Sequence, residues 1–119
     1  ERVFKIIEEI GLKTELWVQA QIRVCDRNLM PIAVVHKGDA DRGSVLLRLL
    51  RRDGRCLVLR RMTTFEGEVG WMVVAGGGEV SEEDARAYGE REVERDRDLW
   101  VVEIEDFDGR YELDAPVES

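Results

Sequence analysis

The sequence is short of the residues on which most catalytic and metal sites depend. It has one histidine, His36, and two cysteines, Cys25 and Cys56. One histidine cannot supply the paired ligands of a zinc site, and two cysteines are too few for a metal motif or a disulfide framework. A Cys25–His36 nucleophile pair would need a proximity that no local pattern supports. We therefore expect no metal, no cofactor, a structural His36, and thiols that stay reduced, with Cys56 filling the core.

Long hydrophobic runs are missing too. No apolar stretch approaches the ~20 residues of a membrane helix. Lys5, Glu8 and Glu9 interrupt the first ten residues, which therefore lack the continuous apolar core of a signal peptide. Together with reduced cysteines, these features predict a cytoplasmic protein that makes no contact with membranes.

Charge is plentiful and mainly negative. The 119 residues suffice for one domain, and they include 26 Asp and Glu against 18 Lys and Arg, for a formal net charge of -8. An acidic surface keeps a protein soluble and disfavours binding to nucleic acid or anionic membranes. Nucleic acid is thus an unlikely partner on composition alone.

The first third of the chain is expected to be helical. Apolar residues at helical spacing followed by Gly11 predict a helix over residues 2–10, which forms an N-terminal extension over residues 1–11. Residues 15–25 allow two interpretations. Their alternation of apolar and polar residues is typical of a strand, whereas a helix capped by Thr14 would be apolar on two sides and would have to be sandwiched.

Strands are predicted over residues 32–37, 44–51, 55–62 and 69–75. Asp53-Gly54 indicates a hairpin between the second and third of these. A three-residue loop with Gly54 in the left-handed region sets Leu47 opposite Leu59 and keeps one face apolar, so we favour that register over a two-residue loop.

A helix and a closing hairpin complete the expected fold. Ser81 has the spacing of an N-cap for a helix that runs to about residue 96. Residues 99–105 are apolar at first and alternate later, which is typical of a strand inside a sheet. Asp108-Gly109 predicts a tight turn that sets Ile104 opposite Leu113.

Three segments resemble a known bacterial family. Residues 12–18 (LKTELWV), 38–46 (GDADRGSVL) and 98–106 (DLWVVEIED) are similar to the family catalogued as domain of unknown function 1491, over roughly residues 12–113. The resemblance implies that residues 14–28 form a helix. It implies no activity, cofactor or catalytic residue. Ile22-Arg23-Val24 departs from the paired basic residues associated with that helix.

The resulting expectation is an α+β fold. It has N-terminal helices, a mainly antiparallel sheet of about five strands, and one further helix before the closing strand. Residues 12–114 form the single domain, and residues 115–119 are a C-terminal tail.

Asp39 and Asp41 are a candidate loop site for a hard cation. A calcium loop would need a carboxylate eleven residues after Asp39, where Leu50 stands, so an Asx-type turn is the better interpretation. Gly76-Gly77-Gly78 before a helix is similar to a phosphate cradle. However, acidic residues crowd that helix start and would repel a phosphate.

An arginine-rich hairpin is the candidate patch for an anion or a partner. It is defined by six residues: Arg48, Arg51, Arg52, Arg55, Arg60 and Arg61. No aromatic residues lie between these arginines, as a single-strand nucleic-acid binder would require. The competing interpretation is that they pair with the acidic segment of residues 82–98.

The leading functional hypothesis is a non-enzymatic interaction module that self-associates, most simply as a dimer, and that has an unidentified protein partner as a further option. The missing catalytic groups support it. The three tryptophans support it as well: core packing is their default role, but a small domain rarely hides three of them fully, so one of them could mark an interface. The alternative is a nucleic-acid-associated accessory factor that uses the arginine-rich hairpin. A metal-dependent enzyme at Asp39 and Asp41 is the weakest.

Overall fold

A computed structural model describes residues 13–63 and 67–118. The helix expected over residues 2–10 lies outside the described residues. Helix α2 spans Thr14–Arg27, so the helical interpretation of residues 15–25 is confirmed. The N-cap is Lys13 rather than Thr14, and the Thr14 hydroxyl instead donates a hydrogen bond to the carbonyl of Gly43.

In the described part of the chain, seven strands form one sheet. They are β1 (Ile32–His36), β2 (Val45–Leu50), β3 (Arg55–Thr63), β4 (Val69–Val74), β5 (Val80–Ser81), β6 (Trp100–Glu105) and β7 (Val117–Glu118). Their order is β1-β6-β2-β3-β4-β7, and β5 pairs with β3. The pairs β2–β6 and β4–β7 are parallel. The sheet is therefore mixed. The expected α+β class is confirmed and four of the six strand pairs described are antiparallel, but the expected number of about five strands is too low and the two parallel pairs were not expected.

The β2–β3 hairpin follows the favoured register. A short 3-10 turn at Arg52–Gly54 joins the strands, with positive φ at both Asp53 and Gly54. Leu47 lies opposite Leu59. The register is the one that keeps the apolar side chains together, because a slip by one residue would turn them to the other face.

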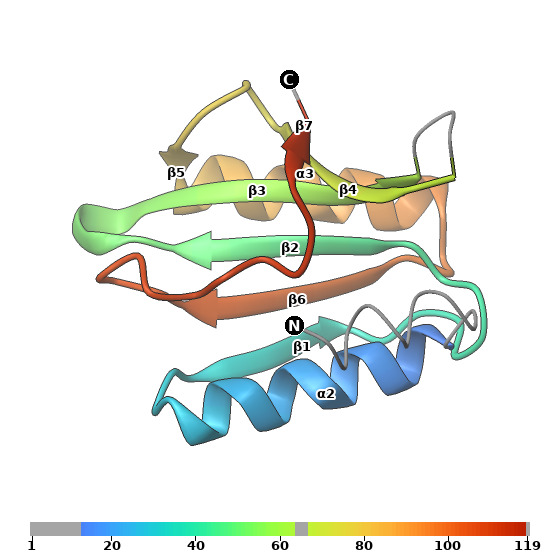
Figure 1. Ribbon diagram of the computed structural model, residues 1–119. Helices are drawn as coiled ribbons and strands as arrows, with labels where there is room; N and C mark the ends of the chain where they lie inside the picture. Colours follow the sequence, from blue (N-terminus) through green and yellow to red (C-terminus); the bar gives the residue numbers. More distant parts are fainter. Residues whose placement is uncertain (1–12, 64–66, 119) are drawn as a thin grey trace.

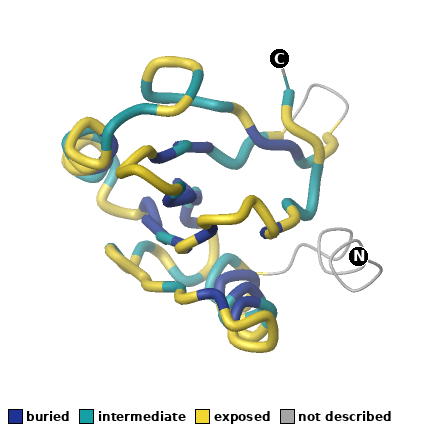
Figure 2. Tube along the Cα trace, turned by 90° about the vertical axis from the view of Figure 1, so that its left-hand side faces the viewer, coloured by how far each residue is buried: buried dark blue, intermediate teal, exposed yellow. Residues whose placement is uncertain are grey.

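Helix α3 spans Glu82–Arg95, and the Ser81 side chain accepts a hydrogen bond from the Asp84 N–H. This confirms the predicted cap. α3 covers the back of the sheet, whereas α2 and the segment 106–116 lie in front of it (Figure 1). Figure 2 looks along the strands and shows the two helices on opposite sides. The sheet thus separates two cores, one around Trp71 and Trp100 and one under α3.

The predicted closing hairpin is wrong. β6 already has neighbours on both sides, β1 and β2, so no edge remains for residues 111–113. Residues 106–116, here called the strap, instead cross the front of the sheet (Figure 1). The strap reaches β4, where the Trp71 N–H donates to the carbonyl of Pro116. The expected tail over residues 115–119 contains β7, which pairs with β4. The sheet therefore continues into this segment after β6.

Candidate functional site

The arginines of the arginine-rich hairpin bind carboxylates and carbonyls of the protein itself. Arg48 lies opposite Glu103 in the parallel β2–β6 register, and its Nη2 is 2.6 Å from Glu103 Oε1. Arg60 contacts α3 through Glu92 Oε1 at 2.9 Å and Asp96 Oδ2 at 4.0 Å. The expected pairing with the acidic helix therefore holds for Arg60, whereas Arg48 pairs with a strand.

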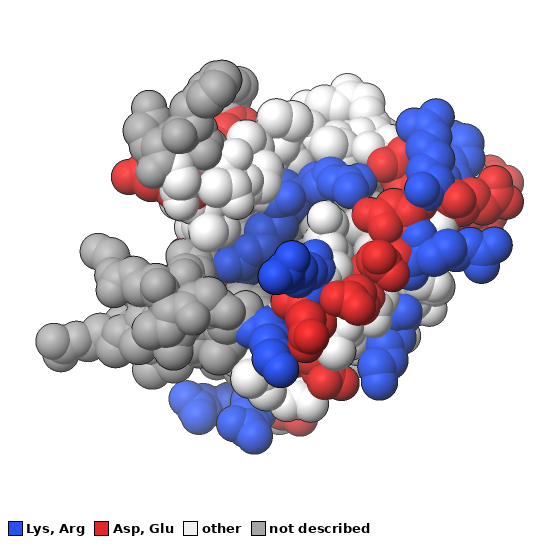
Figure 3. Space-filling view, turned by 90° about the vertical axis from the view of Figure 1, so that its right-hand side faces the viewer, with Lys and Arg blue, Asp and Glu red and all other residues white. Residues whose placement is uncertain are grey.

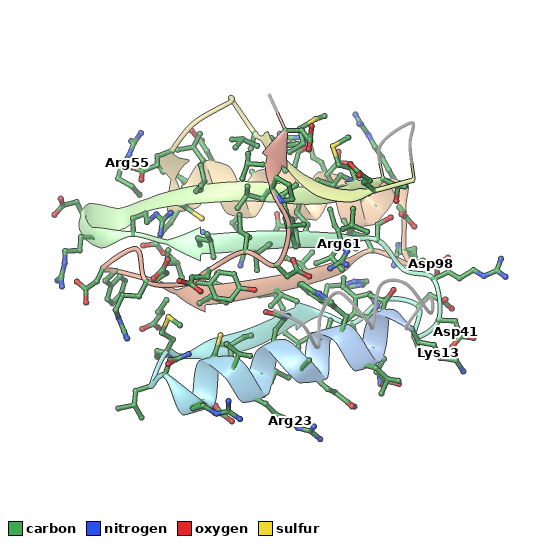
Figure 4. The ribbon with its side chains drawn as sticks, in the orientation of Figure 1. Lys13, Arg23, Asp41, Arg55, Arg61 and Asp98 are labelled. Carbon is green, nitrogen blue, oxygen red and sulfur yellow. The ribbon has the colours of Figure 1, made fainter. Side chains whose placement is uncertain are left out.

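The tip of the hairpin is engaged as well. Arg51 Nη1 is 2.7 Å from Asp106 Oδ2, a carboxylate that is almost fully buried. The more exposed Arg52 pairs with Asp108 at 2.6 Å. Arg55 Nη2 donates to the carbonyl of Glu79, and Figure 4 shows its side chain at the far end of the sheet from Asp98. Five arginines thus lie on one side or at the tip, and each has a partner inside the chain.

Arg61 is separated from the other five. Its side chain lies on the front of the sheet (Figure 4), where the guanidinium carbon is 4.7 Å from the centre of the Trp17 ring and 5.7 Å from that of Trp71. Arg61 Nη1 also donates to Asp114 Oδ2 at 3.3 Å. A cation between two indole faces and a carboxylate is held by cation–π attraction and by charge.

Asp114 joins the strap to α2 and to the sheet. Its carboxylate is 2% exposed and accepts hydrogen bonds from the indole N–H groups of Trp17, at 2.8 Å, and Trp71, at 3.0 Å. We call Trp17, Arg61, Trp71 and Asp114 the front cluster. Sequence reasoning missed it, because its members come from four separate segments and no local spacing connects them.

All three tryptophans lie inside the protein. Trp17, Trp71 and Trp100 are almost fully buried, and the Trp100 indole N–H donates to the carbonyl of Asp39. The default expectation of core packing is therefore confirmed for all three, and the further option that one of them marks an oligomer interface is wrong. A buried indole needs an acceptor for its N–H, and each of the three has one.

A second buried polar contact lies beside the front cluster. The Tyr111 hydroxyl of the strap donates to Gln21 Oε1 of α2. Burial raises the pKa of this phenol, and the nearby Asp114 charge adds to the effect. Gln21 Nε2 is buried and has no hydrogen-bond partner among residues 13–63 and 67–118. The contact fixes the strap against α2, and it offers neither an acid nor a base at neutral pH.

The loop with Asp39 and Asp41 forms a turn. Asp39 Oδ2 accepts hydrogen bonds from the backbone N–H groups of Asp41, at 3.2 Å, and Arg42, at 2.8 Å, which is an Asx-type geometry. Asp41 lies 3.5 Å from Lys13 Nζ, and Figure 4 shows the two side chains together at one end of the molecule. Among residues 13–63 and 67–118, no three His, Cys, Asp or Glu side chains gather to hold a metal.

The remaining candidate groups have structural surroundings. His36 Nδ1 lies 2.8 Å from the carbonyl of Leu99. Cys25 and Cys56 are free and buried, and burial raises the pKa of each thiol to about 11. Such thiols are protonated at neutral pH and are poor nucleophiles.

Figure 3 shows a band of acidic side chains across one end of the molecule, with basic side chains on both sides.

The sheet's outer strand on the α2 side is one of several places in the described part of the chain where apolar side chains are exposed; others are Leu29, Met72, Phe107 and Val117. In β1, Val34 is 39% and Val35 is 51% exposed, and Leu16 of α2 is also exposed. Lys37 follows β1 and lies 3.6 Å from Glu15, which places the start of α2 beside the end of β1. We call Leu16, Val34 and Val35 the edge patch. The apolar sequence of residues 32–36 predicts a strand but does not show which strands lie beside it. Sequence reasoning therefore could not place β1 at the edge of the sheet.

Fold and site together define a small α+β domain with a mixed sheet, in which the buried side chains of the front cluster bind one another. The chain belongs to the DUF1491 family of proteins of unknown function, whose family model matches residues 12–114. The expected resemblance is thus confirmed. No helix in the described part of the chain is long and apolar enough to cross a membrane.

Solved structures of family members share this fold. The crystal structure of a DUF1491 family protein from Caulobacter crescentus CB15 is 42% identical, covers 90% of this chain and 99% of its own, and has a TM-score of 0.81. An NMR structure from the same organism is 41% identical, with 92% and 98% covered and a TM-score of 0.79. The solution structure of protein Atu0922 from A. tumefaciens is 33% identical, with 80% and 86% covered and a TM-score of 0.67. No curated protein matches the chain.

Proposed function

We propose that this protein is a non-enzymatic interaction module that associates with a second copy of itself. The observation that carries the proposal is the edge patch, which exposes Leu16, Val34 and Val35 beside an outer strand of the sheet. Exposed apolar side chains on an outer strand are typical of surfaces that bind another chain. The buried polar groups of the front cluster, by contrast, bind one another.

Charge supports the same surface. Two copies of a chain with net charge -8 repel each other over most of their surfaces. Residues 13–37, which form α2 and β1, contain four basic residues and only two acidic ones. This layer therefore carries a small positive excess within an acidic chain, and two copies can approach there without acidic repulsion.

A nucleic-acid-associated factor remains the second candidate. The arginine-rich hairpin motivates it, and the ion pairs to Glu103, Asp106 and Glu92 weigh against it, because a paired guanidinium must lose its partner before it binds a phosphate. Oligonucleotide titration at physiological salt is its test. Submicromolar binding that is lost on Arg48→Ala and Arg60→Ala would favour this candidate, since phosphate contacts weaken steeply with salt.

Sedimentation velocity over a range of protein concentrations tests self-association. We expect a dimer at tens of micromolar, with a monomer population that grows on dilution. A monomer throughout that range would refute the proposal. We further propose that the protein works in the cytoplasm, where Cys25 and Cys56 stay reduced as in the structure.

A further inference from the structure

β1 is an outer strand, and among the described residues nothing pairs with its free side. Its backbone directions follow from its pairing with β6. The Glu105 N–H donates to the carbonyl of Pro31, and Ala33 lies opposite Glu103. Because alternate residues of a strand direct their backbone groups to opposite sides, Pro31 and Ala33 face β6, whereas Ile32 and Val34 direct N–H and C=O groups outward.

The regular part of this edge is short. A bulge lies between Val34 and His36, and Pro31, which has no N–H, precedes the strand. Lys37 follows it. Proline, bulges and lysine are devices that limit strand pairing at an edge. They leave residues 31–34 as the regular part of β1. This stretch is long enough to pair with one short strand of another chain and too short to support extended strand-to-strand aggregation.

We propose that β1 pairs antiparallel with β1 of a second copy, about a two-fold axis at Ala33. This inference rests on the proposed self-association and names its contact. In this register Ile32 lies opposite Val34 of the second copy, so their outward N–H and C=O groups hydrogen-bond reciprocally. Ala33 then lies opposite its own equivalent in a non-hydrogen-bonded pair, the arrangement that brings side chains closest.

A second copy fits this edge for three reasons. The pairing is self-complementary, as a closed two-fold interface requires. It joins two layers that each have more basic than acidic residues, in chains that are acidic overall, and Lys37 is set away from its own equivalent. Finally, Val34 and Leu16 are exposed and lose exposure when the partner's strand lies alongside, because α2 runs next to β1 at this edge (Figure 1).

Single-cysteine crosslinking tests the register. Ala33→Cys places two thiols on the axis at about 4.5 Å between Cα atoms, which is within the range of a disulfide. The native Cys25 and Cys56 are buried and can stay in place. We expect mild oxidation to convert Ala33→Cys largely to a covalent dimer, seen on a non-reducing gel and lost on reduction.

Two matched controls have similar exposure. Val35→Cys lies opposite Pro31 in this register and cannot pair with itself. Val117→Cys replaces a side chain that is 49% exposed at the other end of the sheet. Each should crosslink at least about tenfold more slowly than Ala33→Cys. Equal rates for Ala33→Cys and either control would overturn the proposed pairing.

A charged variant distinguishes the β1 pairing from self-association in general. Val34→Lys should raise the dimer dissociation constant at least about tenfold, while Val117→Lys leaves it unchanged. A wild-type dimer that Val34→Lys does not weaken would refute the β1 pairing but leave self-association standing. A wild-type monomer at tens of micromolar would refute both. Thermal unfolding of Val34→Lys within a few degrees of wild type verifies that the fold survives.

Discussion

Replacing Asp114 with alanine should remove the connection between the strap and the rest of the protein. The change deletes the acceptor for two buried indole N–H groups, those of Trp17 and Trp71. A buried donor left without an acceptor costs about 1–3 kcal/mol, so the two together cost about 2–6 kcal/mol. We expect Asp114→Ala to lower the free energy of unfolding by about 3–5 kcal/mol, a large part of the ~5–15 kcal/mol typical of a domain.

Urea unfolding followed by tryptophan fluorescence measures this loss, and two of the three tryptophans contact the mutated side chain. Asp114→Asn should cost less than alanine, because its remaining oxygen accepts from one indole while its amide faces the other donor. Glu112→Ala, an exposed change on the same strap, should stay within about 0.5 kcal/mol of wild type. A loss below about 1 kcal/mol for Asp114→Ala would show that the front cluster does not hold the strap.

Three further predictions follow from the same structure. Arg48→Ala should lower the free energy of unfolding by about 2–3 kcal/mol, more than the ~1 kcal/mol expected for Arg60→Ala. The reason is that Arg48 is buried and that its loss leaves the Glu103 carboxylate without its partner. Equal losses for the two variants in urea unfolding would contradict this. The free energy of unfolding should fall as pH rises from about 9 to about 11. In that range the thiols of the unfolded chain, with a pKa near 9.0, release their protons, whereas Cys25 and Cys56 in the folded protein, with a pKa of about 11, keep theirs. A free energy of unfolding that does not change in that window would count against this. Calorimetric titration with calcium, magnesium and manganese should show no saturable heat, and binding that disappears in an Asp39→Ala, Asp41→Ala double variant would revive the metal-dependent hypothesis.

Local features of the fold could be predicted from the sequence. The Ser81 cap depends on one side chain and the N–H three residues later, and the β2–β3 register depends on which leucines share a face. Both are settled within a few residues, so the pattern contains the answer. The apolar segment 99–105 likewise indicated an interior strand, and β6 lies between β1 and β2.

The long-range arrangement could not be predicted in this way. Tyr111 and Leu113 alternate like a strand, yet they pack on the front of the sheet, and an apolar side chain gives the same signal in either case. The parallel β2–β6 pair joins segments separated by half the chain, and no local spacing encodes it. The front cluster is missed for the same reason, since Trp17, Arg61 and Asp114 meet only after the strap has crossed.

The position of β6 between β1 and β2 has a consequence for how the chain folds during synthesis. β1 is made early, but its only strand partner among the described residues is β6, which is made near the end. Until residues 100–105 leave the ribosome, β1 has no sheet to join, and β2 lacks one of its two neighbours. Pairings this distant in sequence slow folding, because the intervening loop must close before any contact stabilises it. The nascent chain therefore presents an apolar, unpaired strand for most of its synthesis, and that strand is the segment a chaperone would be expected to protect.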